Sequence, residues 1–533
     1  VAAGGRANQQ SELEERTMRI CGGRWRMLVL GLLAVCGAGR AREVEAQVFR
    51  LTYSEGIRQA PYTGRVYLFF QQGGRREPRF GPDWFRPGPM VAVDVVGWRA
   101  GDPLEIAADR PAGQVAFPKP LAEQSLAGLK VQAVARFNPL VREVGNGAGN
   151  GYSAVADLPD PLPADQPVEL VLDQLVAERK FTETEWSKLL RVKSQLLGKF
   201  RGRDSFVQGA VVLPASYQTA PNRRYPVLFS VSGFGGNHFS GQRAEPVPEK
   251  NAEGVEFLRV FLDADCPLGH HVFADSANNG PVGQSLVEEF IPALDAAFRT
   301  VAAPTARFVT GHSSGGWSSL WLQVAYPEVF GGCWSTAPDP VDFHDFQQID
   351  MYTPGENMYV DREGNRRPLG RSQGQVLVWY DDFDRMEELL GPGGQLHSFE
   401  AVFSPRGGDG KPLRAWNRQT GVVDLKVTEH WKQYDIAHVL ESEWATRGPR
   451  LKGKLHVIMG DEDTFYLEGA TRRLQQALAR VESDAVVELV PGKDHGSLLT
   501  GELLQRLRSE MVAAYLSRHT PDGTPRQESP PSP

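Results

Sequence analysis

The stretch Arg307-Phe-Val-Thr-Gly-His-Ser-Ser-Gly-Gly316 combines a short apolar strand, a glycine-rich turn and the start of a helix. Within it, Gly311-His-Ser-Ser-Gly315 matches the pattern G-x-S-x-G. When a strand runs directly into a helix through such a turn, the glycines allow a tight backbone and the serine hydroxyl stands above the sheet. We therefore expect Ser313 to be a nucleophile rather than a helix-capping serine.

Apolar runs and segments with helical periodicity alternate on both sides of this turn. Candidate strands occupy residues 206–213, 225–231, 257–263, 333–336, 455–459 and 486–490, and candidate helices occupy 286–298, 315–326, 469–481 and 501–517. This alternation predicts an α/β domain over 205–518, with a doubly wound, mostly parallel sheet covered on both faces. Residues 340–450 interrupt the alternation, and an insertion after a strand is expected to overhang the edge where ligands bind.

A serine nucleophile needs a base, and the base needs an acid that orients it. The strand ending near Met459 is followed by Gly460-Asp-Glu-Asp463, and the strand ending near Val490 is followed by Asp494-His495. Both loops follow carboxyl ends of strands, on the same edge of the sheet as Ser313. We predict His495 as the base and Asp463 as the acid, with Asp461 as the alternative acid.

Acyl transfer also requires hydrogen-bond donors for the oxyanion that develops on the substrate. One predicted donor is the backbone N–H of Ser314, directly after the nucleophile. The other is the backbone N–H of Phe234 in the loop Ser232-Gly-Phe-Gly-Gly236, where glycines let the chain approach a substrate. The alternative interpretation of this loop is an ordinary glycine turn.

Taken together, these motifs resemble the esterase family of α/β-hydrolases, which includes esterase D, enterochelin esterase, feruloyl esterases and the mycobacterial mycolyltransferases. The resemblance rests on Tyr225-Pro-Val-Leu228, Gly311–Gly316, Tyr326-Pro-Glu-Val-Phe330 and the loops that hold Asp463 and His495. It implies an α/β-hydrolase fold, the triad Ser313, Asp463 and His495, and the two oxyanion donors. Many members have His-Gly where this chain has Ser232-Gly233, which leaves the backbone donor intact but changes the support of the loop.

The N-terminal part of the chain has a different pattern. Residues 47–180 contain short alternating runs separated by Gly- and Pro-rich turns, which predicts an immunoglobulin-like β-sandwich. Because no triad residue falls in it, this domain is expected to be dispensable for the hydrolysis of a small ester. Residues 181–204 are interpreted as an interdomain junction, and the proline-rich residues 519–533 as a disordered tail.

Residues 1–46 are interpreted as a leader that contains a signal peptide. Arginines precede about a dozen apolar residues from Met27 to Ala38, too few to span a bilayer. Cleavage near Ala46 would give a secreted or periplasmic protein. Only Cys266 and Cys333 lie beyond this leader, and a disulfide between them is not expected, because the strands ending at Val231 and Thr310 should separate them.

Composition and spacing exclude several classes of function. The chain has 58 basic and 65 acidic residues and no long basic run, which argues against a nucleic-acid protein. Asp263, Asp265, Cys266, His270 and His271 are clustered, but their spacing fits no zinc pattern, so no metal or other cofactor is expected. Trp416 and Trp431 in the insertion could stack on a substrate, although a small core of the insertion is the better explanation of these residues.

The sequence therefore predicts a secreted serine hydrolase that cleaves a carboxylic ester, small or carbohydrate-linked, through an acyl-enzyme on Ser313. One alternative is an acyltransferase, in which the same acyl-enzyme passes to an alcohol. The other is a non-catalytic protein that binds glycans through the β domain. The complete Ser, Asp, His order argues against the last of these.

Overall fold

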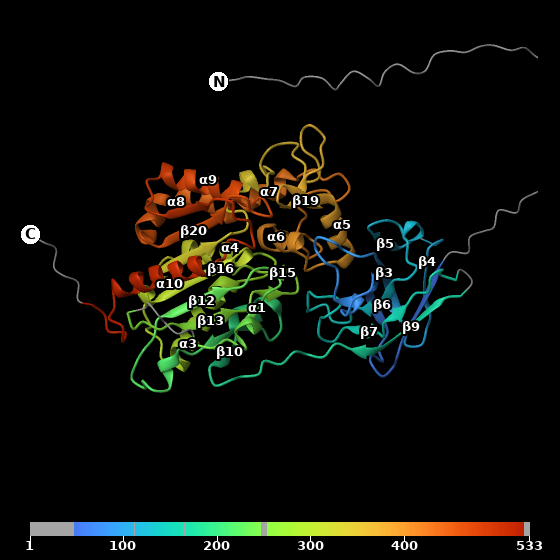
Figure 1. Cartoon of the computed structure of the whole chain (residues 1–533), viewed down its shortest axis with the longest axis horizontal. Helices are drawn as coiled ribbons and strands as arrows, with labels where there is room; N and C mark the ends of the chain where they lie inside the picture. Colours follow the sequence, from blue (N-terminus) through green and yellow to red (C-terminus); the bar gives the residue numbers. More distant parts are fainter. Residues whose placement is uncertain (1–46, 111, 164–165, 247–252, 527–533) are drawn as a thin grey trace, which may run out of the picture. The chain divides into compact units, whose positions relative to one another are not determined.

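The computed structural model describes residues 47–110, 112–163, 166–246 and 253–526 (Figure 1). Its central element is an eight-stranded sheet with the strand order β10-β11-β13-β12-β16-β17-β20-β21. Its strands are β10 (Ser187–Lys193), β11 (Phe206–Val212), β12 (Val227–Val231), β13 (Leu258–Leu262), β16 (Arg307–His312), β17 (Gly332–Thr336), β20 (Leu455–Gly460) and β21 (Val486–Val490). The pairs from β13 to β21 are parallel, and β10 and β11 add antiparallel pairs at one side. The predicted α/β architecture is therefore present.

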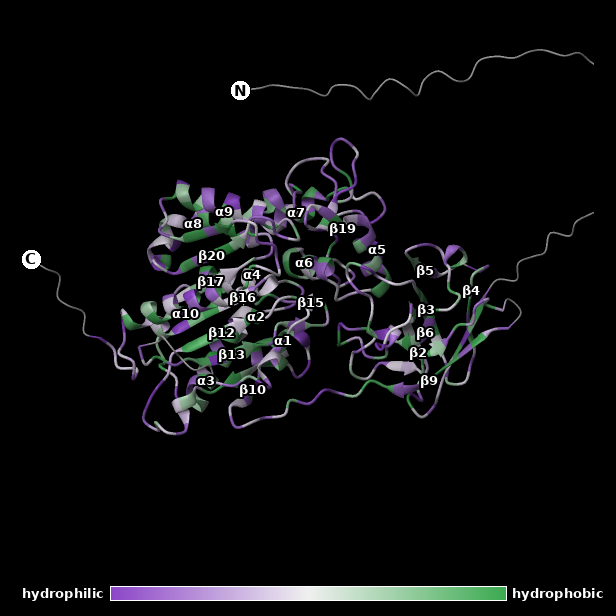
Figure 2. Cartoon of the chain, viewed as in Figure 1, coloured by the Kyte–Doolittle hydropathy of each residue, from purple (hydrophilic) through white to green (hydrophobic). Residues whose placement is uncertain are grey.

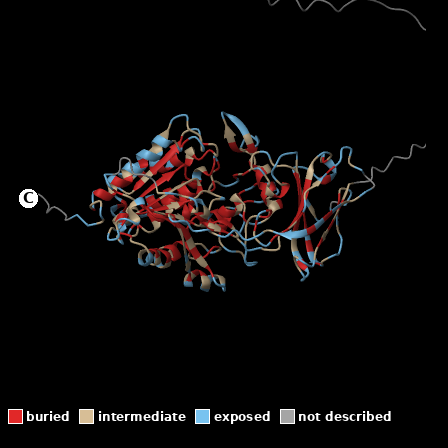
Figure 3. Cartoon of the chain, turned by 60° about the horizontal axis from the view of Figure 1, so that its bottom comes forward, coloured by how far each residue is buried: buried red, intermediate tan, exposed pale blue. Residues whose placement is uncertain are grey.

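Alternate residues of the strands face two different cores, which is why these runs are apolar throughout. Phe229, Val309 and Cys333 belong to one core, and their neighbours Phe308 and Trp334 belong to the other. The first core is covered by helices α4 (Ser314–Ala325), α8 (Ile436–Leu451) and α9 (Glu468–Arg480), and the second by α10 (Gly501–Leu516). The strands are correspondingly hydrophobic in Figure 2 and buried in Figure 3.

Three shorter helical elements cover the sheet before the nucleophile turn. They are α1 (Gln195–Arg201), α2 (Val282–Ser285) and α3 (Ile291–Ala297), and a π-helical turn over Leu286–Phe290 joins the last two. A two-stranded pair, β14 (Asp265–Cys266) and β15 (Gly269–His270), follows β13. Cys266 and Cys333 are buried free thiols, and β12 and β16 separate β13 from β17, as expected from the sequence.

The insertion after β17 is a folded layer. It contains the hairpin β18 (Pro368–Ser372) and β19 (Gln375–Trp379), followed by α5 (Tyr380–Leu390), α6 (Gln395–Phe403) and α7 (Leu425–Trp431). Helix α8, which the sequence analysis placed inside the insertion, packs against α4 and α9 and covers the central sheet. The insertion proper therefore ends before Ile436.

The N-terminal β domain is one continuous nine-stranded sheet with the order β4-β1-β9-β7-β6-β2-β3-β5, and β8 pairs with β6. Its strands are β1 (Val48–Tyr53), β2 (Tyr62–Gln71), β3 (Met90–Trp98), β4 (Leu104–Ala107), β5 (Gln114–Phe117), β6 (Lys130–Ala135), β7 (Gly151–Ser153), β8 (Ala156–Asp157) and β9 (Val168–Leu175). Phe49 of β1 meets Phe70 of β2 edge-to-face at 5.4 Å between ring centroids, so the sheet curls over its own core. The immunoglobulin-like assignment stays a prediction.

The outer face of this β domain packs on the hydrolase part of the chain. Tyr67, Phe69 and Met90 belong to the same hydrophobic core as the central sheet. The Tyr67 hydroxyl donates to the carbonyl of Leu390 at 2.8 Å, and Arg65 Nη1 donates to the carbonyl of Glu388 at 2.8 Å. Both acceptors lie at the carboxyl end of α5, where backbone carbonyls lack partners within the helix.

Two predicted boundaries differ in the structure. Strand β10 lies within the predicted junction 181–204 but pairs with β11 as an edge of the central sheet, because its apolar residues find a partner there. His519 is buried at 3% exposure, and its Nε2 lies 2.7 Å from Thr305 Oγ1, so residues 519–526 pack on the domain instead of forming a tail. The predicted leader over 1–46 and residues 527–533 lie outside the described residues. Among the helices that are described, none is both long and apolar enough to cross a membrane.

Candidate active site

Ser313 occupies a strained turn between β16 and α4. Its backbone angles are φ 61° and ψ −127°, a region that residues other than glycine rarely adopt. The two motif glycines make the turn possible, because a Cβ on Gly311 would lie 2.1 Å from the carbonyl oxygen of Gly315, and a Cβ on Gly315 would lie 2.0 Å from that of Val231. Such strain costs about 1–3 kcal/mol and persists where the surrounding structure enforces it.

The structure brings His495 and Asp463 together. His495 Nδ1 and Asp463 Oδ2 are 2.7 Å apart, and the Asp463 side chain is fully buried. The other Asp463 oxygen accepts the backbone N–H of Phe465 at 2.8 Å, which fixes the carboxylate. Asp461, the alternative acid, points elsewhere and accepts the N–H of Gly492 at 2.7 Å. His495 thus has one carboxylate partner for its Nδ1.

Two rings enclose the imidazole of His495. The His312 ring centroid lies 4.6 Å away, and the Phe465 ring meets His495 edge-on at 5.0 Å. Burial lowers the pKa of His495, but the hydrogen bond and charge of Asp463, with the charges of Asp339 and Asp494, outweigh it, so the pKa is raised. No hydrogen bond joins Ser313 Oγ to His495 among the described residues, and such contacts often tighten only in the substrate complex.

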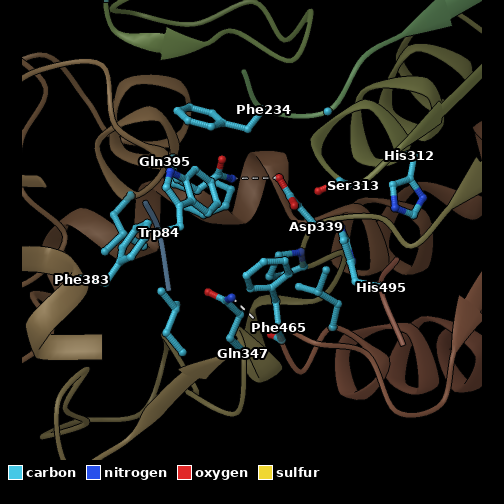
Figure 4. Close-up of a pocket in the computed structure, with 16 residues that line it drawn as sticks. Trp84, Phe234, His312, Ser313, Asp339, Gln347, Phe383, Gln395, Phe465 and His495 are labelled. Carbon is cyan, nitrogen blue, oxygen red and sulfur yellow. Dashed lines mark hydrogen bonds between the residues drawn. The ribbon is translucent and has the colours of Figure 1, made fainter. Parts of the chain in front are cut away.

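The loop after β12 lies directly over the nucleophile. A Cβ on Gly233 would lie 3.3 Å from Ser313 Cβ and 3.2 Å from the carbonyl oxygen of His312, so a larger residue would crowd the turn. Phe234, the next residue, lines the same cavity as Ser313 (Figure 4). The N–H groups of Phe234 and Ser314 have no hydrogen-bond partner within the described part of the chain. They are therefore available to donate hydrogen bonds to a ligand.

Two residues from distant segments support this loop. His270 Nδ1 accepts the N–H of Val272 at 3.2 Å, which leaves the proton on Nε2, 2.9 Å from the carbonyl oxygen of Ser232. Burial lowers the pKa of His270 to about 4, so the ring is neutral. Arg142 of the β domain lies 4.7 Å from the Phe234 ring centroid and forms an ion pair with Asp265. Two members of the sequence cluster therefore support the loop, His270 directly and Asp265 through Arg142.

A cavity of about 300 Å³ opens beside Ser313. The insertion supplies part of its wall, including Gln347, Phe383 and Gln395, as expected for a segment that overhangs the site. The β domain supplies Trp84, which contacts Phe383 edge-on at 5.3 Å and Phe234 at 5.6 Å (Figure 4). Sequence reasoning missed Trp84, because nothing in a loop between two β strands indicates which distant site it reaches.

Asp339 is a carboxylate in the lining of the cavity that sequence reasoning missed. It follows β17 by three residues, which is the signal that could have found it. Its Oδ2 accepts from Ser314 Oγ at 2.5 Å, and its backbone N–H donates to the carbonyl of Ser313 at 3.3 Å. Burial raises the pKa of Asp339 to about 6.

The structure does not bring Trp416 and Trp431 to this cavity. Trp416 Nε1 donates to Asp384 Oδ2 at 2.9 Å, and Trp431 Nε1 donates to Ser404 Oγ at 3.0 Å. Both side chains are buried inside the insertion at 1% and 0% exposure. They form the core of the insertion, because a buried indole needs a hydrogen-bond partner and apolar neighbours, and both are found there. The prediction that Trp416 and Trp431 contact the substrate is therefore wrong.

Comparison with known proteins identifies one family that matches the chain. The family model described as "Putative esterase" matches residues 204–495, just over half of the chain, and so the chain belongs to this esterase family of α/β-hydrolases. The match begins just before β11 and ends at His495. No curated protein sequence matches.

Solved structures with a similar arrangement are distant in sequence. A ferulic acid esterase is 14% identical, with 62% of this chain and 99% of that chain covered and a TM-score of 0.38. An S-formylglutathione hydrolase from Agrobacterium tumefaciens is 14% identical over 64% and 97% of the two chains, with a TM-score of 0.36. A ferulic acid esterase from Anaeromyces mucronatus is 15% identical over 64% and 95%, with a TM-score of 0.33.

Proposed function

We propose that the protein is a secreted serine esterase that cleaves a carboxylic ester through an acyl-enzyme on Ser313. The observation that carries the proposal is the 2.7 Å contact between His495 and Asp463 beside a serine held in a strained strand-to-helix turn. Strain at a functional residue is retained when the surrounding fold enforces it. Membership of the esterase family supports ester hydrolysis, and the predicted signal peptide supports export.

In this mechanism Ser313 Oγ attacks the ester carbonyl while His495 Nε2 takes its proton. Asp463 holds the proton on His495 Nδ1 and stabilises the imidazolium that forms. The oxyanion of the tetrahedral intermediate accepts hydrogen bonds from the backbone N–H groups of Phe234 and Ser314. His495 then protonates the leaving alkoxide, and the acyl group stays on Ser313 until a water molecule, deprotonated by His495, releases it as a carboxylic acid.

The support of the oxyanion loop is part of the proposal. A backbone donor is useful only when it is already aimed at the position that the oxyanion will occupy. His270 fixes the carbonyl of Ser232, and the Arg142 guanidinium packs on the Phe234 ring. These contacts hold the loop from both sides, in a chain that has Ser232-Gly233 in place of the His-Gly found in many members of the family.

Labelling with a fluorophosphonate probe tests the proposal. We expect one covalent adduct on Ser313, mapped by peptide mass spectrometry, and protection by a slowly hydrolysed ester. A panel of esters that includes acetylated and feruloylated sugars should then show burst kinetics with at least one member, because the acyl-enzyme accumulates. Labelling at another residue, with ester turnover unaffected by the adduct, would contradict the assignment of Ser313.

A further inference from the structure

Asp339 is a buried carboxylate with which no lysine or arginine of the described residues pairs; among nearby groups only His495, when protonated, offers it a positive charge. Its side chain lies in the cavity beside Ser313, and the residue is 6% exposed. Only Ser314 Oγ at 2.5 Å and Gln395 Nε2 at 3.4 Å donate side-chain hydrogen bonds to it in the described part of the chain. A buried ion is destabilising by several kcal/mol unless it is paired. A carboxylate in this position therefore indicates a cationic partner that is part of the ligand.

The rest of the cavity lining supplies acceptors and aromatic rings. Among its described lining residues there is no lysine or arginine. Gln395 Oε1 is buried and has no hydrogen-bond partner. The rings of Trp84, Phe234 and Phe383 stand on the side of the cavity opposite His495 (Figure 4). Aromatic faces attract cations, and tryptophan does so most strongly.

We propose that this cavity binds a cationic ammonium group of the ester substrate, which Asp339 pairs with and the rings of Trp84, Phe234 and Phe383 surround. This inference rests on the proposed esterase function and names the class of substrate for the same site. Asp339 hydrogen-bonds to Ser314, the residue after the nucleophile. The ammonium group that pairs with Asp339 would therefore lie close to the scissile carbonyl, and Asp339 would select substrates that carry this group. The β domain takes part in the selection through Trp84.

A cation fits these observations better than an anion or a neutral hydroxyl. An anionic group would meet the Asp339 carboxylate with no basic residue to compensate for it. A hydroxyl would satisfy a hydrogen bond but would gain little from three aromatic faces, whereas an ammonium group gains from both the charge and the rings. The carboxylate is ionised at neutral pH, since burial raises its pKa only to about 6.

Two matched pairs of esters test the proposal on the full-length protein. Acetylcholine and 3,3-dimethylbutyl acetate differ only in a quaternary nitrogen and a carbon, and they probe the alcohol side. The trimethylglycine and 3,3-dimethylbutanoic acid esters of one alcohol probe the acyl side in the same way. We expect a kcat/KM at least ~10-fold higher for the cationic member of one pair, equivalent to about 1.4 kcal/mol.

Variants separate the charge from other effects. In Asp339→Asn the ratio of cationic to neutral kcat/KM should fall by about tenfold, because the amide keeps the size but loses the charge. In Trp84→Ala the ratio should fall by a smaller factor. Asp173→Asn removes a carboxylate from an exposed strand of the β domain, and Trp444→Ala removes an indole of α8 outside the cavity; both should leave the ratio unchanged. Taking the ratio within each variant cancels differences in ester reactivity.

Competition provides a measurement that needs no variant. Choline should inhibit hydrolysis of the neutral ester competitively, at least ~10-fold more tightly than 3,3-dimethylbutan-1-ol. Equal inhibition by the two alcohols, with equal turnover within both ester pairs, would overturn the proposal. So would a ratio of cationic to neutral kcat/KM in Asp339→Asn that equals the ratio of the wild-type protein. If no ester of either kind is hydrolysed, the proposed esterase function fails instead, so the two failures are distinguishable.

Discussion

Asp463 and Asp461 lie two positions apart in the same loop, and only their contacts distinguish them. Asp463 is fully buried against His495, whereas Asp461 joins the loops after β20 and β21 through the N–H of Gly492. A carboxylate that sets the tautomer of the base affects catalysis, and one that bridges two loops affects stability. The two residues therefore offer a matched pair of variants.

We predict that Asp463→Asn lowers kcat on the order of 10⁴-fold, because an amide permits the wrong tautomer of His495. Asp461→Asn should change kcat far less, since the one side-chain contact of Asp461 in the described part of the chain is the backbone N–H of Gly492, which the amide oxygen can still accept. Steady-state hydrolysis of p-nitrophenyl acetate measures both. A larger loss of kcat in Asp461→Asn than in Asp463→Asn would contradict the assignment.

The pH dependence of kcat/KM reports on His495. The base must be neutral to accept the proton of Ser313, so kcat/KM is full above the raised pKa of His495 and falls as pH drops through it, above the usual 6.5. Asp339→Asn removes one of the charges that raise this pKa, so the acidic limb should move to lower pH. Asp173→Asn should not move it. A limb that stays in place or moves to higher pH in Asp339→Asn would show that Asp339 does not act on His495.

At the scale of the element, the loop after β12 depends on residues that the sequence pattern did not connect with it. His270 lies in β15, and its Nε2 donates to the carbonyl of Ser232. In the sequence this histidine stands out only as part of a cluster whose spacing fits no zinc pattern. Its role became visible once β14 and β15 were seen to place it beneath the loop, since a hydrogen bond between distant segments leaves no local signal.

We predict that His270→Ala lowers kcat by about 10- to 100-fold with little change in KM. Loss of a direct oxyanion donor costs about 10²- to 10³-fold, and displacement of the loop that carries one should cost less. His270→Gln retains a donor and should recover part of the loss, while His344→Ala, an exposed histidine of the insertion, serves as the control. An unchanged kcat, or equal losses in the Ala and Gln variants with the fold intact, would argue against positioning by His270.

The hydrolase elements could be predicted from the sequence because each carries a local signal. The strand, glycine turn and helix around Ser313 fix its conformation. The carboxyl ends of parallel strands place Asp463 and His495 at the same edge of the sheet as Ser313. Trp84 could not be assigned, because its loop reaches the site only through tertiary packing. Asp339 could have been found, because it follows the carboxyl end of β17 by three residues. The role of Trp416 and Trp431 could not be decided from the sequence, since a tryptophan buried in a core and one that binds a substrate look alike in sequence.

At the scale of the whole molecule, the β domain is part of the site and of the core. Because residues 47–180 hold no triad residue, the sequence alone predicts that they are dispensable for the hydrolysis of a small ester. The structure places Trp84 in the wall of the cavity and Arg142 on the Phe234 ring. Tyr67, Phe69 and Met90 also belong to the hydrophobic core of the hydrolase part. Deleting the domain would expose this surface, so we now expect it to be required.

The shared core predicts that the two parts unfold together. Differential scanning calorimetry should show one cooperative transition for the protein. Phe69→Ala, at the face that packs on the hydrolase part, should lower the free energy of unfolding by about 3–5 kcal/mol and shift the whole transition. Two resolved transitions, with only the smaller one moved by Phe69→Ala, would mean that the β domain folds independently.

The central claim is that Ser313 performs the chemistry, and turnover by Ser313→Ala tests it most directly. The variant should keep the fold, because Ser313 Oγ has no hydrogen-bond partner in the described part of the chain that would be lost. With a neutral ester that the wild-type protein hydrolyses, kcat of Ser313→Ala should fall by several orders of magnitude, and His495→Ala should fall almost as far, since residues that act as a unit are not additive. Near-normal turnover by a purified, folded Ser313→Ala protein, free of contaminating esterase, would contradict the account.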